Sequence, residues 1–539
     1  MIFSSPFPDV PIPADKGSWS YLELHAHDEN AHKPAFVCAV TRREVTFAQA
    51  HAQAKQIVAG LHARGIQKHD VVVLHSFNCI EYPIVFLALN RLGAICSSSP
   101  PMLDATGLSV QVKTAGAKAI IAHKTLAQAA LDAAQLAQVP TNQVYTIADA
   151  DSLEALPAQS IEELMAEDLP FPKLPPLNPN DVVFLPFSSG TTGRPKGVQL
   201  TGRGMHAVDL EFSSIAPVGP YSLGLAPFFR TGVIIFHLSV YSGTATVVMP
   251  HFEPELFLSV LETYKLEAII VPPPLILFLA NDSRVEKYDL SHLKVIACGG
   301  APLKLEAERI AEKRLNVTIT QGYGCTELAG AATFSTPFTK RHGSTGVLVP
   351  NARLKVVSLT TGEELLRNEP GELLFSTPSV TPGYWRYPEA NETLFDADGF
   401  LRSGDYGYID DDGFVFVVDR IKEFIKYEGH QVAPAELEEV LEKHPLVADS
   451  CCVRGHDEES GEEVPKAYVV LQKGESGGEV LKQELMRFVN DQVAPYKHIR
   501  EVEFTDQIPR NPTGKTLRRE LQLLENEKVA RAKQQAAIA

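Results

Sequence analysis

The stretch Phe187–Val198 holds the residue types best suited to binding an anion. It contains four hydroxyl residues, three glycines and a lysine. Glycines let backbone N–H groups turn toward an anion, hydroxyls donate further hydrogen bonds, and Lys196 supplies a mobile cation. The stretch lacks the Gly-Lys-Ser/Thr ending of a Walker A loop. A flexible linker is the alternative, but linkers rarely carry Thr-Thr, Pro and Lys in this order. We therefore predict a phosphate-binding loop.

A second polar segment, Gln321–Glu327, follows an apolar run that reads as a strand. Its two glycines flank Tyr323, which suits the close approach of a flat heterocycle. Thr326 could contact a phosphate and Glu327 a Mg²⁺ ion, because magnesium in proteins takes hard oxygen ligands together with substrate phosphates. An ordinary strand-to-helix turn would look much the same, so this segment alone leaves both interpretations open.

Four further charged residues are candidates for a nucleotide site. Asp405 is expected at a turn, where it could accept hydrogen bonds from ribose hydroxyls, although a purely local turn role is the commoner one. Arg420 is a second candidate for the sugar or the phosphate. Lys426 and Lys515 are the notable cations of the last hundred or so residues, and Lys515 lies in a Pro/Gly-rich loop rather than on a helix face.

The elements that would position these residues alternate between strands and helices. Apolar runs predict strands at 71–74, 119–122, 182–185, 268–271, 295–297 and 317–320, and helices are expected near 45–65, 80–92 and 126–136. This alternation is typical of parallel sheets covered by helices. After residue 371 short strands and turns take over, and a compact α+β unit follows with helices at 434–442 and 481–489.

The chain is too long for one hydrophobic core. With 539 residues, it is expected to form an N-terminal domain at 1–420, a C-terminal domain at 421–525 and a solvated helical tail at 526–539. The polar junction Asp419–Lys422 is the expected hinge between the two domains.

Composition narrows the functional class. The chain is 45% hydrophobic and 21% charged, as in soluble globular proteins, and its net charge of −17 argues against a nucleic-acid partner. Seven cysteines without CxxC spacing favour a reduced, intracellular protein. We find no signal peptide, no apolar run long enough for a transmembrane segment and no C-terminal Ser-Lys-Leu, so a cytoplasmic location is expected.

Taken in order, these segments resemble the motifs of adenylate-forming enzymes. Asp419–Lys422 and Pro512–Lys515 complete the series, and Ile425–Glu438 looks most like the branch of 4-coumarate–CoA ligases and luciferases. The resemblance spans nearly the whole chain. It implies an α/β fold, in which a large N-terminal domain of two helix-covered sheets and a small β-barrel-like subdomain is followed by a small mobile α+β domain.

The resemblance also implies a reaction in two steps with ATP, Mg²⁺ and coenzyme A. A carboxylate attacks the α-phosphate of ATP and releases pyrophosphate, and a thiol then displaces AMP from the acyl adenylate. By this resemblance, the β- and γ-phosphates would be bound by Ser188, Ser189, Gly190, Thr191, Thr192 and Lys196, and adenine by Gln321, Gly322 and Tyr323. Thr326 would bind the α-phosphate, Glu327 would bind Mg²⁺, and Asp405 and Arg420 would bind the ribose. Lys515 would bind oxygens of both the carboxylate and the α-phosphate. Rotation about Lys422 would then replace Lys515 by the segment from Lys426 to Gln431.

By the same resemblance, the acid pocket would be lined by small and apolar residues. These are Phe229, Arg230, Ile234, Gly300, Ala301, Gly324, Gly330 and Ala331, although the small ones could equally serve close packing. Such walls favour a hydrophobic or aromatic carboxylic acid, such as a cinnamate or a fatty acid, as the small-molecule substrate. Arg230 departs from the family, which usually has a histidine there, and its permanent charge could pair with an acidic substrate end or alter carboxylate placement.

The expected CoA-binding residues are His251, Glu428 and Gly429. His251 and Glu428 stand where related ligases often carry lysines, so positive charge is reduced where CoA phosphates would lie. An enzyme that delivers its acyl adenylate to a carrier protein or another acceptor is therefore the alternative. An inactive scaffold with the same fold is a further one, against which the intact Lys196, Glu327, Asp405 and Lys515 argue.

Overall fold

A seven-stranded sheet forms the first layer of the N-terminal part. The computed structural model describes residues 1–147, 158–189, 195–216, 219–457, 462–511 and 514–538. Strand order in this sheet is β12 (Leu200–Thr201), β9 (Val182–Phe184), β5 (Ile95–Ser99), β4 (Val71–His75), β6 (Ala119–His123), β7 (Val144–Ile147) and β8 (Gln159–Ser160). All pairs are parallel except that of β12 with β9. Strand β4 is buried along its whole length, as expected of a strand covered on both faces.

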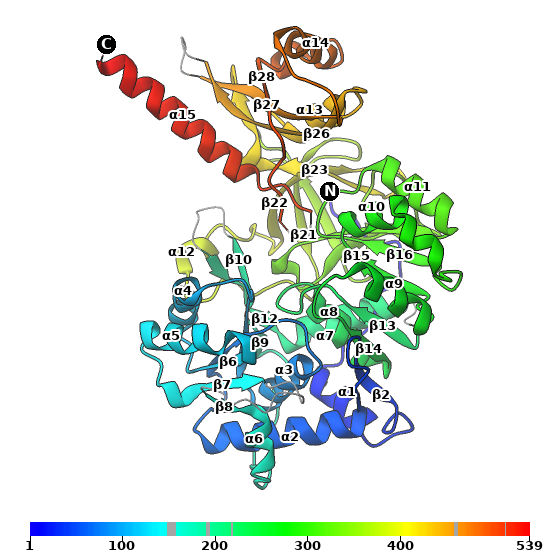
Figure 1. Ribbon diagram of the computed structural model, residues 1–539, viewed down its shortest axis with the longest axis vertical. Coiled ribbons are helices and arrows are strands. Elements are labelled where there is room, and N and C mark those ends of the chain that lie inside the picture. The colour runs from blue at the N-terminus through cyan, green and yellow to red at the C-terminus, as the bar shows by residue number, and fades with distance from the viewer. Residues whose placement is uncertain (148–157, 190–194, 217–218, 458–461, 512–513, 539) are drawn as a thin grey trace.

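Helices pack around this first sheet (Figure 1). They are α2 (Phe47–Ala63), α3 (Glu81–Leu92), α4 (Ala105–Ala115), α5 (Ala127–Ala137) and α6 (Ile161–Ala166). Helix α2 begins at a capping box formed by Thr46 and Gln49, and α3 ends at Gly93, whose φ of 79° only glycine adopts at low cost. The helices expected near 45–65, 80–92 and 126–136 are thereby confirmed.

The second layer consists of two hydrogen-bonded pieces whose neighbouring strands, β13 and β15, are in contact. The first piece has the order β13 (Tyr221–Gly224), β14 (Ala245–Val248), β2 (Pro34–Cys38) and β3 (Glu44–Thr46). The second runs through β15 (Ala268–Val271), β16 (Val295–Cys298), β17 (Thr318–Gly324), β18 (Ala331–Phe334) and β19 (Val347–Leu348). The helices between these strands are α7 (Gly202–Ile215), α8 (Gly232–Ser242), α9 (Pro254–Thr263), α10 (Pro273–Asn281) and α11 (Leu305–Leu315), and α1 (Ser18–His25) packs on α8.

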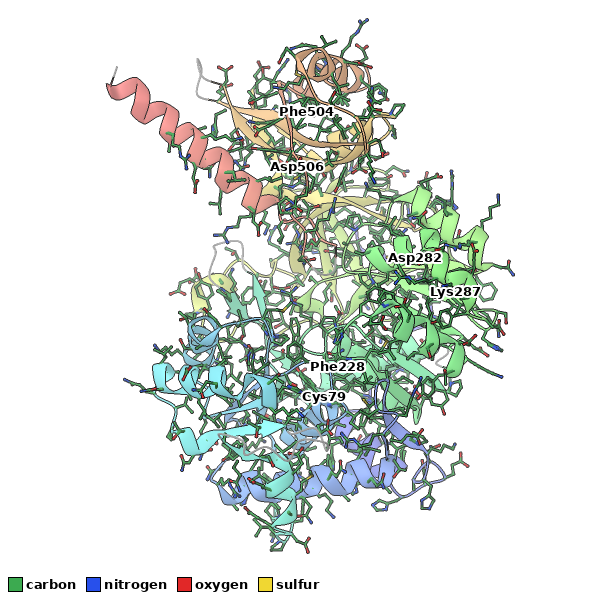
Figure 2. All side chains as sticks on the ribbon, in the orientation of Figure 1. Cys79, Phe228, Asp282, Lys287, Phe504 and Asp506 are labelled. Atoms are coloured by element: carbon green, nitrogen blue, oxygen red, sulfur yellow. The ribbon has the colours of Figure 1, made fainter. Side chains whose placement is uncertain are left out.

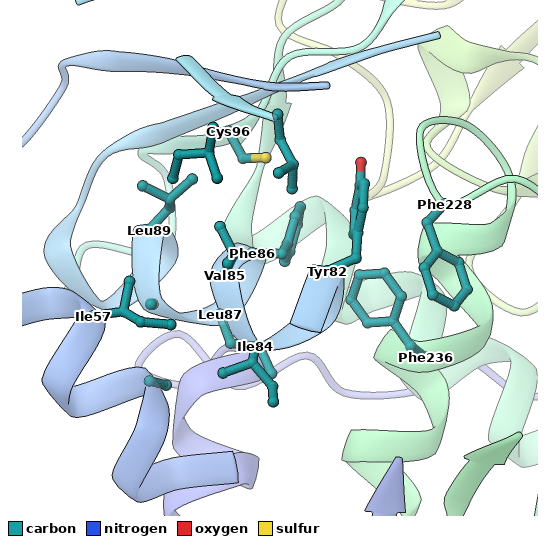
Figure 3. Close-up of a cluster of buried hydrophobic side chains, with 14 of the residues drawn as sticks. Ile57, Tyr82, Ile84, Val85, Phe86, Leu87, Leu89, Cys96, Phe228 and Phe236 are labelled. Atoms are coloured by element: carbon teal, nitrogen blue, oxygen red, sulfur yellow. The ribbon is translucent and has the colours of Figure 1, made fainter. Parts of the chain in front are cut away.

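Aromatic side chains fill the core between α3 and α8 (Figure 3). The rings of Phe228 and Phe236 lie 5.1 Å apart, and Tyr82 lies 5.6 Å from Phe228. Phe86 contacts Phe236 edge-on at 5.4 Å. Truncating one such buried ring to alanine typically costs about 3–5 kcal/mol of unfolding free energy. This core therefore holds α8 firmly against the first layer.

An antiparallel sheet forms the small β subdomain of the N-terminal part. Its order is β1 (Phe3–Ser4), β20 (Arg353–Val357), β21 (Gly371–Ser376), β22 (Leu401–Ile409) and β23 (Val415–Arg420), and the short helix α12 (Pro388–Asn391) lies between β21 and β22 in sequence. With two helix-covered layers and this sheet, the expected α/β class is confirmed.

The C-terminal unit lies beyond β23, at the top of Figure 1. Its elements are β24 (Ile425–Tyr427), β25 (His430–Val432), α13 (Pro434–Leu441), β26 (Val447–His456), β27 (Glu463–Leu471), α14 (Glu479–Asn490), β28 (Glu501–Phe504) and α15 (Arg518–Ile538). Phe504 and Asp506 mark this unit in Figure 2, whereas Phe228 and Cys79 mark the N-terminal part. The predicted α+β pattern is found here with small shifts in its boundaries.

Helix α15 begins before the expected tail and runs through the expected boundary between residues 525 and 526. Its first turns pack on the C-terminal unit because Glu525 lies 3.0 Å from the buried Lys466, which also pairs with Glu501 and Glu503 at 2.7 and 2.9 Å. Leu521 is buried beside them. The start of this helix is thus part of the unit.

Among the residues that the structure describes, no helix has the length and apolar character needed to cross a bilayer. All seven cysteines are free thiols, and Cys96, Cys298, Cys451 and Cys452 are buried.

Candidate active site

The predicted phosphate-binding stretch includes two antiparallel strands, β10 (Phe187–Ser189) and β11 (Pro195–Gly197). Ser188 and Lys196 are paired across the two strands. The Lys196 ammonium lies 4.8 Å from the ring centroid of Tyr384 and 5.3 Å from that of Tyr387, within cation–π range. Of the remaining site residues expected here, Gly190, Thr191 and Thr192 lie outside the described residues, as does the side chain of Ser189.

Glu327 connects this hairpin to the segment around Tyr384. Its Oε1 accepts a hydrogen bond from the Tyr384 hydroxyl at 2.9 Å and a longer one from Ser188 Oγ at 3.5 Å. Its backbone carbonyl accepts from the Thr381 N–H at 2.7 Å. Burial and the nearby Glu327 carboxylate both raise the pKa of Tyr384, so the phenol remains a donor. The sequence analysis missed Tyr384, although an aromatic pair in a Pro/Gly-rich stretch was a signal for it.

A Mg²⁺ ion at Glu327 would need ligands from elsewhere. Among the described residues, no three His, Cys, Asp or Glu side chains form a cluster that could hold a metal. One carboxylate beside several hydroxyls fits a cation that keeps waters and takes its other ligands from a bound phosphate. The donor set is therefore compatible with magnesium brought in with a nucleotide.

Tyr323 and Arg420 both bind the carboxylate of Asp405. The Tyr323 hydroxyl donates to Asp405 Oδ2, and Arg420 Nε lies 3.3 Å from Asp405 Oδ1. Asp405 and Arg420 are register partners in β22 and β23, which explains why residues fifteen apart in sequence meet. Asp405 is only 4% exposed, and this burial raises its pKa despite the opposing charge of Arg420.

Two local expectations were wrong. Asp405 lies inside strand β22 and not at a turn; the Ser403-Gly404 pair kinks the strand, with a φ of 69° at Gly404, without ending it. Likewise, Gln321, Gly322 and Tyr323 do not follow the strand but belong to it. Strand β17 continues because it changes partner, from parallel pairing with β16 up to Gln321 to antiparallel pairing with β18 from Gly322 onward.

Lys515 of the C-terminal unit lies beside this Asp405–Arg420 pair. Burial, together with the positive charge of Arg420, lowers the pKa of Lys515 to about 8, and the carboxylates of Glu423 and Asp405 oppose this shift. The Lys515 backbone N–H donates to Asn511 Oδ1 at 2.9 Å. The partly buried Lys515 therefore lies where the two parts of the protein meet, next to Asp405, whose carboxylate Tyr323 orients.

Lys426 occupies a different place, on the exposed hairpin of β24 and β25. Lys426 and Gln431 are register partners, and the Lys426 backbone N–H donates to Glu463 Oε2 at 2.9 Å. The turn between the strands has positive φ at both central residues, 47° at Glu428 and 77° at Gly429, as in a type I′ turn. Lys422 lies at the junction, in the single 3₁₀ turn Ile421–Glu423.

The expected acid-pocket residues come from several elements of the second layer. Phe229 precedes α8, and its carbonyl accepts from Ser98 Oγ at 2.8 Å; Arg230 is exposed next to it, 6.0 Å from the Phe229 ring. Ile234 lies in the first turn of α8. Gly300, which has a φ of 86°, and Ala301 follow β16, whereas Ala331 begins β18.

Packing leaves no room for a side chain at Gly324 and little room at Gly330. A Cβ at Gly324 would collide with the carbonyl oxygen of Gly330, and one at Gly330 would lie 3.0 Å from both methyl groups of Val208. Close packing, the alternative left open above, thus explains both glycines whether or not they line a pocket. His251 lies on the surface just before α9.

Lys304 ties the C-terminal unit to the N-terminal part in this pose. Its Nζ lies 3.0 Å from Glu442 Oε1 and 3.8 Å from Asp449 Oδ1, both in the C-terminal unit. Gly514, just before Lys515, is so close to Pro274 of α10 that a Cβ there would come within 2.7 Å of it. These contacts hold Lys515 near Asp405.

We expect Lys304→Ala to weaken this pose and to slow any reaction that depends on Lys515. Because the Lys304 side chain is 47% exposed, the effect should be modest, about twofold to fivefold, and smaller at high ionic strength. ATP–pyrophosphate exchange at low and high salt measures it. Lys294→Ala is the matched control, since Lys294 pairs with Glu267 at 3.4 Å within the N-terminal part. An equal effect of both substitutions would contradict the assignment.

Comparisons with known proteins agree with the order of these segments. The family model of AMP-binding enzymes matches residues 22–385, and that of the AMP-binding enzyme C-terminal domain matches residues 436–515. The chain is 35% identical to 4-coumarate–CoA ligase 2 of Oryza sativa subsp. japonica over 551 residues, which cover 96% of this chain and 94% of that protein. It is 36% identical to 4-coumarate–CoA ligase of Pinus taeda over 545 residues, covering 96% of this chain and 97% of that protein.

Among solved structures, ATP-bound MatB from Rhodopseudomonas palustris has a TM-score of 0.85 with this chain at 24% identity, covering 94% of this chain and 99% of that one, a likeness of fold. The first family model spans both layers and the loops that carry Lys196 and Glu327, and the second ends at Lys515. The chain therefore belongs to the AMP-binding enzyme family, in the acyl-CoA synthetase branch of the adenylate-forming superfamily.

Proposed function

We propose that this protein is an ATP-dependent ligase that joins a hydrophobic or aromatic carboxylic acid to AMP and then transfers the acyl group to coenzyme A. The observation that carries the proposal is the position of Lys515, held by the C-terminal unit beside Asp405 and Arg420 of the N-terminal part. A partly buried cation next to a carboxylate suited to bind ribose would serve the attack of an anion on a nucleotide phosphate.

In the first step a carboxylate oxygen forms a bond to the α-phosphorus of ATP while the bond to pyrophosphate breaks. Both reactants are anions, so preorganised positive charge is the main catalytic requirement. Lys515 would bind the attacking carboxylate and the α-phosphate, and Lys196 the departing phosphates. Glu327 would hold Mg²⁺, which supplies further positive charge to those phosphates.

The remaining site residues would orient the nucleoside and the phosphates. Tyr323 holds Asp405 by a hydrogen bond, which keeps its other oxygen and Arg420 available for the ribose hydroxyls. Gln321 and Gly322 would face adenine, and the hydroxyl of Thr326 the α-phosphate. Hydrogen bonds of this kind fix the phosphate for in-line attack.

In the second step the CoA thiol attacks the acyl carbonyl and AMP leaves. We propose that the C-terminal unit turns about Lys422, which withdraws Lys515 and brings the hairpin with Lys426 and Gln431 to the site. Ile425 and Val432 anchor the hairpin in the core of the C-terminal unit, whereas Lys426 and Gln431 are exposed, so a rotation of the unit would carry these two side chains with it. Glu428 and Gly429 at its tip, and His251, would border the CoA path.

Arg230 supports a narrower choice of acid. The residue is exposed beside Phe229, burial around its guanidinium lowers the pKa of Arg230, and no carboxylate lies within 4.0 Å of it among the described residues. An aromatic or aliphatic acid that carries a hydrogen-bond acceptor away from its reacting carboxylate would satisfy both side chains. We therefore place acids with such a second acceptor ahead of simple fatty acids.

The direct test is carboxylate-dependent ATP–pyrophosphate exchange across cinnamic, benzoic and fatty acids, with and without a second acceptor group. We expect exchange with at least one aromatic acid, followed by thioester formation when CoA is added. Exchange without transfer to CoA, but with transfer to a phosphopantetheinylated carrier protein, would favour the alternative acceptor. No exchange with any acid would leave only the inactive scaffold.

A further inference from the structure

A network of buried polar side chains joins three helices behind the proposed acid site. His237 of α8 lies at its centre, with Nδ1 2.6 Å from Asp209 Oδ2 of α7 and Nε2 hydrogen-bonded to Ser18 Oγ of α1. Asp209 and His237 are each 1% exposed, and Ser18 is 8% exposed. Burying a carboxylate costs free energy unless it is paired, so this buried carboxylate is expected to have a role that offsets the cost.

A second imidazole flanks the same carboxylate. His206 Nδ1 lies 3.9 Å from Asp209 Oδ2, while its Nε2 is hydrogen-bonded to the Tyr21 hydroxyl at 3.1 Å. Among the described residues, neither His206 Nδ1 nor Asp209 Oδ1 has a hydrogen-bond partner. The bond to His237 is therefore the main interaction that orients Asp209, and with it the facing sides of α7 and α8.

The connectivity Ser18–His237–Asp209 is also that of a serine-hydrolase triad. Burial argues against this chemistry, because a nucleophile must reach its substrate and both Ser18 and His237 are almost inaccessible. The network is better explained by the contacts that α7 and α8 make with residues of the proposed acid site.

Each of the two helices joined by this bond contacts or carries residues of the proposed acid site. On α7, Val208 is adjacent to Asp209 in sequence and packs against Gly330. Helix α8 begins just after Arg230 and carries Ile234 in its first turn. Next to His237, the Phe236 ring packs 5.1 Å from Phe228, so any shift of α8 is passed to the segment that holds Arg230 (Figure 3).

We propose that the Asp209–His237 bond is a positioning pair that sets the separation of the two walls of the acid site and thereby determines how well the acid is bound. This inference rests on the proposed function and deepens it. Among the described residues, the pair contacts neither the strands β10 and β11 nor Asp405, so its loss should alter recognition of the acid and leave recognition of ATP unchanged.

Two substitutions of His237 separate its two hydrogen bonds. His237→Gln places an amide near the position of Nε2 and loses the bond to Asp209, whereas His237→Asn places one near Nδ1 and keeps it. We expect His237→Gln to raise the KM for the acid about tenfold in ATP–pyrophosphate exchange, with the KM for ATP within about twofold of the unaltered protein, because small misplacements at a reacting centre are costly. His237→Asn should restore most of the affinity for the acid.

Glu211→Gln is the matched control, because Glu211 is also on α7 and 1% exposed but bonds Asn351, at 3.1 Å, away from α8. Burial raises the pKa of Glu211 to about 8, so the neutral amide is a close substitute and the KM for the acid should not change. Thermal unfolding of each variant reports whether the fold is kept.

Three results would overturn the inference. One is an unchanged KM for the acid in a folded His237→Gln, and another is an equal rise for Glu211→Gln. The third is covalent labelling of Ser18 by a fluorophosphonate, which would show an accessible nucleophile. If the unaltered protein showed no exchange with any acid, the proposed function would be overturned as well. Assaying the unaltered protein beside the variants distinguishes this outcome from failure of the inference alone.

Discussion

Lys515→Ala is expected to reduce ATP–pyrophosphate exchange by about a hundredfold to a thousandfold, the usual effect of removing one preorganised donor from a charged transition state. The reason is that Lys515 is the cation of the C-terminal unit that borders Asp405 and Arg420, where attack on the α-phosphate is proposed. Conversion of a chemically supplied acyl adenylate to its thioester should be nearly unchanged, because Lys515 has left the site in that step. Exchange assays and thioester assays on the same preparation measure the two effects.

The pH dependence of exchange provides the control for Lys515. With a pKa lowered to about 8, this lysine is charged below that pH and neutral above it, so kcat/KM for the free enzyme should fall as pH rises through about 8. Lys515→Arg keeps its charge throughout and should lose this decline, even if its rate is lower. Equal losses of exchange and thioester formation in Lys515→Ala would contradict the proposed rotation of the C-terminal unit.

Glu327→Gln is expected to lower exchange by about a hundredfold and to raise the Mg²⁺ concentration needed for half of the maximal rate. The amide retains an oxygen that can accept from Tyr384 and Ser188, so the loss isolates the negative charge. Exchange measured over a magnesium titration tests it.

Tyr384→Phe distinguishes a metal ligand from a structural carboxylate. This substitution removes the 2.9 Å hydrogen bond to Glu327 but keeps the negative charge of Glu327. The rate of ATP–pyrophosphate exchange is therefore expected to fall by about tenfold or less. If Tyr384→Phe were as damaging as Glu327→Gln with no change in the magnesium requirement, Glu327 would be a structural residue.

Local sequence patterns predicted helices and strands well where a single physical effect, such as burial or backbone freedom, decided the local structure. The runs at 71–74 and 119–122 are strands because a continuous apolar segment of that length is stabilised where helices cover both faces of a sheet, whereas the strand at 268–271 alternates exposed and buried residues. Gly93 ends α3 as expected, since the left-handed conformation there favours glycine. The composition of Phe187–Val198 predicted a phosphate-binding loop, because backbone freedom and hydroxyl groups are properties of the residues themselves; its described arms form the strand pair β10–β11, and its binding of phosphate stays a prediction.

Other features depend on partners distant in the chain and could not be read locally. Gln321–Tyr323 extends a strand, and Asp405 is strand rather than turn, because β18 and β23 supply hydrogen bonds that override the glycines. The first turns of helix α15 pack on the C-terminal unit because Lys466, far away in sequence, binds Glu525. Tyr384 was missed because the aromatic pair in its Pro/Gly-rich stretch does not by itself indicate that Glu327 is its partner.

By itself, the sequence determined which side chains are available for chemistry and in what order they occur. Residue types and short-range backbone preferences depend only on each residue and its neighbours in the chain. Only the tertiary structure decided which of the two candidate lysines stands beside Asp405, and that a buried aspartate and histidine join α7 to α8. Such choices depend on which distant groups are desolvated together. The energy of a charge is set by those surroundings and not by its own place in the chain.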